Sequence, residues 1–133
     1  MNVLRSWGFF MYAAGVTTRR WLACAAASLI AAAGMMTGHA LAAAARAAGE
    51  ESAVAQGLGV ASWVVAGAAA VLIDRDVPAQ AVAAASVVLP LVWFATLENP
   101  LWLLGLAAMT LFALIAGLSA AVTKFACRAA RRT

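Results

Sequence analysis

Residues 101–123 read LWLLGLAAMTLFALIAGLSAAVT, and the ten residues that follow, 124–133, read KFACRAARRT. The first stretch has 23 residues and no charged side chain. A helix needs about 20 apolar residues to cross the ~30 Å hydrocarbon core of a bilayer. Together the two stretches predict a transmembrane helix that ends in a basic tail at the membrane surface.

Three more apolar runs precede this one, at residues 21–45, 53–73 and 79–97. The chain is 66% hydrophobic and 11% charged, with a mean hydropathy of +0.95, whereas a soluble domain carries about 25% charged residues. A water-soluble fold of 133 residues cannot bury that much apolar surface. We therefore expect an all-α integral membrane protein, with residues 1–133 forming one membrane domain of four transmembrane helices in a small bundle.

The nine basic residues are distributed unevenly between the two ends of these runs. With four crossings, eight of the nine lie on one face of the membrane, and Arg46 is the exception. Because basic residues accumulate on the cytoplasmic side, both termini are predicted to be cytoplasmic. The high Ala and Arg content favours a bacterial source, and hence the inner membrane. Six basic residues are expected to meet lipid head groups: Arg19, Arg20, Lys124, Arg128, Arg131 and Arg132.

The first 20 residues are basic and rich in aromatic side chains, namely Trp7, Phe9, Phe10 and Tyr12. Their apolar part, residues 6–16, has eleven residues, which is too few to cross a bilayer. Aromatic rings at head-group depth are typical of interfacial segments. The sequence thus predicts a short interfacial helix before the first span.

The first run also has features of a cleavable leader. Residues 18–22, TRRWL, resemble the twin-arginine export pattern, and residues 40–42, ALA, fit an A-x-A cleavage site. Cleavage after Ala42 would leave 91 residues and three spans. The twenty residues before the run are long for a leader, which favours retention of the run as a true span.

Small residues on the runs indicate where helices pack closely, because Gly and Ala let two backbones approach each other. Gly34 and Gly38 form a GxxxG pattern in the first run. The predicted packing positions are Gly34, Gly38, Gly57, Ala61, Gly67, Gly105 and Gly117. Pro90 is predicted to kink the third run, because proline lacks the backbone N–H. The short connection 98–100 predicts that the third and fourth runs form a tight antiparallel hairpin.

The chain has few residues suited to chemistry. His39 is its single histidine, and Cys24 and Cys127 are its cysteines, so neither residue type has the spacing of a metal site. All the acidic residues map to predicted helix ends or loops, which argues against an ion-coupled transport pathway. No catalytic grouping or nucleotide-binding loop is recognisable. We therefore expect no enzymatic activity, no cofactor, no metal and no nucleic-acid partner.

The leading hypothesis is a non-enzymatic role as an accessory or structural subunit of a larger membrane complex, such as a secretion or conjugation apparatus. Its expected partners are the lipid bilayer and other membrane subunits or further copies of the chain. Small-residue faces, short loops and a missing catalytic inventory favour this class.

Three alternatives stay open. A small transporter or channel fits the length, although the four-span multidrug exporters carry a glutamate in their first span and residues 21–45 have none. A holin-like pore former is similar to the chain in its few spans and basic tail. A conjugative pilin resembles the chain if residues 1–42 are a cleaved leader and residues 53–97 a helical hairpin, but the run at 101–123 departs from that plan.

Overall fold

The computed structural model describes residues 2–51, 53–98 and 100–133, with the side chains of all of these except residues 2–4 and 7–16. The described residues form helices and no strand, which confirms the expected all-helical class. The five helices are α1 (Asn2–Ala47), α2 (Ala53–Ile73), α3 (Ala79–Ser86), α4 (Val88–Ala95) and α5 (Trp102–Ala130). Three helical stretches are long and apolar enough to cross a membrane: Thr17–Ala47 within α1, all of α2, and α5.

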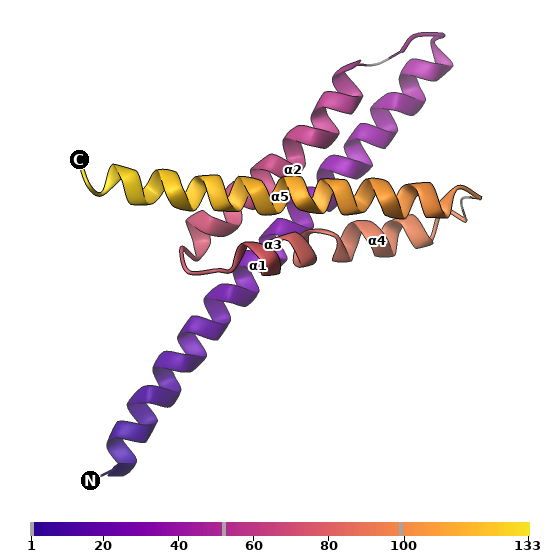
Figure 1. Ribbon diagram of the computed structural model, residues 1–133. Helices are drawn as coiled ribbons and strands as arrows, with labels where there is room; N and C mark the ends of the chain where they lie inside the picture. The colour runs from indigo at the N-terminus through magenta and orange to yellow at the C-terminus, as the bar shows by residue number, and fades with distance from the viewer. Residues whose placement is uncertain (1, 52, 99) are drawn as a thin grey trace.

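The helices form two antiparallel hairpins that cross each other (Figure 1). In the first hairpin α2 packs along the C-terminal part of α1, and in the second α3 and α4 return beside α5. The hairpins are joined at the crossing, where α5 contacts α2 and α3 contacts α1. The N-terminal part of α1 extends beyond the other helices (Figure 1).

Small side chains make up most of the core. Ala23, Ala27 and Ala31 of α1 are fully buried and lie four residues apart, on one face of the helix. Such a row lets a neighbouring backbone approach closely, and it packs in one cluster with buried alanines of α2 and α5. The largest buried side chain is Trp63 of α2, whose ring stacks on Phe112 of α5 at a centroid distance of 5.5 Å. Many large aliphatic side chains face outward, among them Leu72, Leu111 and Leu118.

Two glycines of α1 permit its close approach to α2. A Cβ added to Gly34 would overlap the side chain of Ser62. A Cβ added to Gly38 would lie 3.1 Å from the carbonyl oxygen of Ala55. The GxxxG pair therefore lies at the α1–α2 contact, where even a methyl group would force the helices apart.

Three other predicted packing glycines touch different neighbours. A Cβ on Gly67 would overlap the backbone of Ala116 in α5, and one on Gly105 would overlap the ring of Phe94 in α4. A Cβ on Gly117 would lie 3.2 Å from the Cβ of Ala83 in α3. The hairpin expected from residues 79–97 and 101–123 thus has contacts along its length.

Gly57 and Ala61 depart from the expected packing role. Both are exposed, and no described atom lies within 4 Å of a Cβ added to Gly57. The two residues are four positions apart on α2, so they share a face that points away from the rest of the chain. Neither residue packs against another helix in the part of the chain that the structure describes.

The third apolar run, residues 79–97, forms two short helices and not the single kinked helix that was expected. Helix α3 ends at Ser86 and α4 begins at Val88. The expected kink is therefore a break, and it lies one turn before Pro90. A proline ring clashes with the carbonyl of the residue four positions earlier, here Ser86, and lacks the N–H that would bond to it. The distortion consequently falls on the residues that precede the proline.

A residue of α1 stabilises this break. The backbone N–H of Leu89 donates a hydrogen bond to Ser28 Oγ over 3.1 Å, across 61 positions of the sequence. Within the second hairpin, the Ser86 hydroxyl donates to the carbonyl of Ala83. A backbone group freed by the interruption of α3 is thus paired in an apolar interior, where an unpaired N–H would be costly.

The ends of the first and last helices also differ from expectation. Helix α1 is continuous from Asn2, so no boundary separates a short interfacial helix from the first span. The side chains of Trp7, Phe9, Phe10 and Tyr12 lie outside the described residues. Helix α5 continues past Thr123 to Ala130, so most of the basic tail is helical. Basic side chains suit this end of a helix because they face the negative end of its dipole.

Candidate functional site: a basic hollow at one end of the helices

Three separate segments meet around a hollow of about 490 Å³. Arg19 comes from α1, and residues 71–76 form the end of α2 and the turn after it. The last two turns of α5 add Lys124, Cys127 and Arg128, and Arg131, the residue that caps this helix, also lines the hollow. We call this feature the basic hollow, because Arg75 brings its basic residues to five.

Helical periodicity explains which tail residues reach the basic hollow. Lys124 and Arg128 occupy positions i and i+4 of α5. The C-cap Arg131 follows at i+7 with helical backbone angles, so the three share one face. Arg132 follows next in sequence but is exposed and does not line the hollow. Adjacent residues of the same type therefore have different surroundings.

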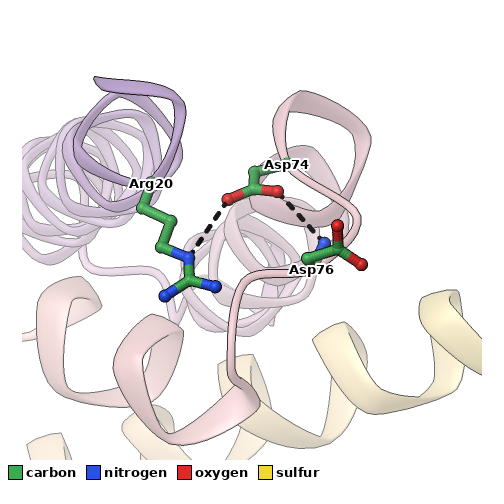
Figure 2. A network of polar contacts seen from close by, with 3 residues as sticks. All are labelled: Arg20, Asp74 and Asp76. Carbon is green, nitrogen blue, oxygen red and sulfur yellow. Dashed lines mark hydrogen bonds and ion pairs between the residues drawn. The ribbon is translucent and has the colours of Figure 1, made fainter. Parts of the chain in front are cut away.

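Asp74 is the buried polar group of this site, and Figure 2 shows its surroundings. Asp74 directly follows the last residue of α2 and is only 8% exposed. Its Oδ1 accepts a hydrogen bond of 3.1 Å from the backbone N–H of Asp76, which closes the turn in the manner of an Asx turn. Its Oδ2 lies 3.8 Å from Nε of Arg20 in α1, an ion pair that joins α1 to the turn.

The second carboxylate oxygen of Asp74, Oδ2, has no hydrogen-bond donor among the described residues. Asp74 Oδ2 is buried and accepts no hydrogen bond from the described residues. A buried carboxylate oxygen is stabilised by hydrogen bonds as well as by a nearby charge. The Arg20 pair supplies the charge at long range, and a hydrogen-bond donor is what the site lacks.

The hollow carries an excess of positive charge. Its lining has five basic residues and two acidic ones, Asp74 and Asp76, which gives a formal balance of +3. Cations gathered from three segments repel one another unless an anion lies between them. Guanidinium and ammonium groups arranged in this way bind phosphate through charge-assisted hydrogen bonds.

Four of the six residues expected to meet lipid head groups line the hollow: Arg19, Lys124, Arg128 and Arg131. Arg20 instead pairs with Asp74, and Arg132 lies outside. The sequence pointed to neither Arg75 nor Asp74 as part of a site. The charge distribution already placed Arg75 on the same face as the tail, and that signal could have identified it.

The other residues considered for chemistry lie apart from the hollow, except Cys127. His39 of α1 packs edge to face against Trp93 of α4, at a centroid distance of 5.4 Å and an interplanar angle of 78°. Among the described residues, no group of three or more His, Cys, Asp or Glu could hold a metal ion. No protein-family model matches the chain, and no match was found among the curated proteins or the solved structures.

Proposed function

We propose that this chain is a non-enzymatic integral membrane protein, an accessory subunit that acts by packing helix against helix in a larger membrane complex. One face of α5 carries the proposal. Its exposed residues recur at alternating spacings of three and four, at Leu104, Ala107, Leu111, Leu114, Leu118, Ala121 and Phe125. This is the spacing of a helix-packing seam, and we call it the α5 seam.

The α5 seam is free within the chain. Leu111 is 64% exposed and Leu118 is 66% exposed. The small residues Ala107 and Ala121 lie on either side of three leucines in this seam and would let a partner helix lie close. Such a face in a bilayer suits either lipid or another helix, and its alternating spacing of three and four residues favours a helix.

The arrangement of the helix ends supports four crossings and cytoplasmic termini. Arg19, the turn at residues 74–76 and the end of α5 gather at one hollow. Since α2 and α5 both finish there, α3 and α4 must return the chain to the opposite end between them. Ala79–Ala95 is a short crossing, about 25 Å at 1.5 Å per residue. Residues 96–101 and local bilayer thinning would make up the difference.

A reporter enzyme that is active only outside the cytoplasm tests this topology. Fusion after Gly49 should give activity, whereas fusions after Asp76 and after Thr133 should be silent. Activity after Thr133 combined with silence after Asp76 would mean that α3 and α4 do not cross. An active fusion after Asp76 would overturn the orientation.

The role of the α5 seam needs a separate test. The tagged protein would be extracted from its native membrane in a mild detergent, and its native mass and co-purifying chains measured. We expect stoichiometric companions that are lost with Leu111→Ala plus Leu118→Ala. The matched control is Leu22→Ala plus Leu29→Ala on α1, two residues that are 56% and 60% exposed, lie off the seam and have the same spacing of seven. A monomer without companions, or equal losses from both variants, would refute the proposal.

A further inference from the structure

We propose that the basic hollow binds the phosphodiester of a membrane lipid whose head group also carries a hydroxyl, as a phosphoglycerol head group does. This inference rests on the proposed membrane location. It does not depend on the chain being a complex subunit. Two independent features of the hollow select the two parts of such a head group.

The first feature is the surplus of positive charge, which selects the phosphate. Arg19, Lys124 and Arg128 approach from two different helices, and Arg75 from the turn between α2 and α3. Opposed side chains of this kind can bind the oxygens of one phosphate from more than one direction. A phosphodiester carries one negative charge, so the surplus of +3 from the lining is reduced but not reversed.

The second feature is the buried oxygen of Asp74, which selects the hydroxyl. Asp74 is one of the residues that line the hollow, and its buried Oδ2 accepts no hydrogen bond from the described residues. A phosphodiester group by itself cannot satisfy it, because an ionised phosphodiester has no O–H and, like the carboxylate, only accepts hydrogen bonds. A head group with a hydroxyl beside its phosphate would donate to Asp74 while its phosphate stays among the basic residues.

The location of the hollow selects a lipid over a soluble ester. It lies where the apolar residues of α2 end, with Val71, Leu72 and Ile73 among its lining residues. This is the depth at which head groups meet the apolar core. The acyl chains of a lipid would follow the exposed apolar surface of α2, where Leu72 is 70% exposed. A soluble ester would gain nothing from that surface.

Native mass spectrometry of the purified full-length protein in detergent micelles tests the proposal. Three short-chain lipids would be titrated: phosphatidylglycerol, phosphatidylethanol, which has the same charge but no hydroxyl, and zwitterionic phosphatidylcholine. We expect phosphatidylglycerol to bind about tenfold more tightly than phosphatidylcholine, and more tightly than phosphatidylethanol. Equal binding of all three would overturn the site, and equal binding of the first two would overturn the role of Asp74.

Adjacent arginines supply the matched variants. Arg131→Gln should weaken phosphatidylglycerol binding about tenfold, whereas Arg132→Gln, with the same change of charge outside the hollow, should leave it within twofold. Asp74→Asn keeps an oxygen that can accept the hydrogen bond from the Asp76 N–H. It should reduce the ratio between the affinities for phosphatidylglycerol and phosphatidylethanol. Equal effects of Arg131→Gln and Arg132→Gln would show nonspecific attraction and refute the site.

A competition experiment separates the possible sources of the phosphate. Soluble glycerol phosphate should fail to displace phosphatidylglycerol at equal concentration, because it lacks the chains that lie on α2. Displacement at equal concentration would overturn the assignment to a lipid. Resistance of the protein to extraction from membranes by alkaline carbonate is measured separately, so failure of the membrane location is distinguishable from failure of the lipid site.

Discussion

Ser28 in α1 and Leu89 in α4 are joined by a hydrogen bond of 3.1 Å from a backbone N–H to a side-chain hydroxyl. The bond crosses between the two hairpins at the point where α3 has ended and α4 has begun. It therefore links the position of the break to the position of α1.

Removal of this hydroxyl should destabilise the fold. Ser28→Ala removes the acceptor of the Leu89 N–H. We expect this change to lower the free energy of unfolding by about 1 kcal/mol. Unfolding by SDS in mixed micelles, followed by far-UV circular dichroism, measures it. Thr37→Ala is the control, because the Thr37 hydroxyl donates its hydrogen bond to the carbonyl of Ala33 within the same helix. Equal stability of the Ser28 variant and the parent protein would contradict the role of this bond.

Pro90→Ala should join α3 and α4 into one continuous helix, and the stability of that helix should then depend less on Ser28. An alanine restores the N–H that proline lacks and removes the clash with the Ser86 carbonyl. In the continuous helix that results, Leu89 would bond to Ala85 and no longer need Ser28. A double-mutant cycle checks this: Ser28→Ala should cost less in the Pro90→Ala protein than in the parent. Additive losses would mean that the break has another cause.

Gly34 and Gly57 form a matched pair on the two helices of the first hairpin. Gly34→Ala would place a methyl group against the side chain of Ser62. We expect this change to lower the free energy of unfolding, measured in SDS, by about 1–3 kcal/mol. Gly57→Ala faces open space and should be neutral or stabilising by up to about 1 kcal/mol, because Ala favours helix. Similar losses for both would place the α1–α2 contact elsewhere.

Cys127 reports the side of the membrane on which the basic hollow lies. In a Cys24→Ser protein, a thiol reagent that cannot cross membranes should modify Cys127 in inverted vesicles and not in intact cells. Because Cys127 lines the basic hollow, phosphatidylglycerol should slow this modification in micelles. Modification in intact cells would reverse the orientation, and a rate unaffected by the lipid would contradict lipid binding at the hollow.

Hydropathy alone located the apolar segments well, because lipid-exposed helices need only length and low charge. Residues 53–73 were expected as a helix and form α2 with the same bounds. The distribution of basic residues likewise anticipated that Arg19 and the C-terminal tail lie together. Both signals depend on composition along the chain, which needs no knowledge of neighbours.

The remaining features depend on neighbours that the sequence does not specify. Gly57 and Gly67 are both glycines in the same apolar run, but of these two residues Gly67 alone faces another helix. Proline predicts a distortion near residue 90, but a clean break at residues 86–88 also uses Ser28, which lies 61 positions from Leu89. Asp74 was expected at a helix end or in a loop, and its burial depends on α1, whose Arg20 pairs with it.

The buried alanines of α1 do not fix the position of this helix along its axis relative to its neighbours. Ala23, Ala27 and Ala31 repeat every four residues, so moving α1 by about one turn would replace two of them by alanine again. The same slide would bring Gly38 to the place of Gly34, but it would put Ala32 where Ser28 meets Leu89 and Cys24 where Arg20 meets Asp74. The alanine row therefore does not by itself select one position of α1 along its axis. The Ser28–Leu89 hydrogen bond and the Arg20–Asp74 ion pair select that position.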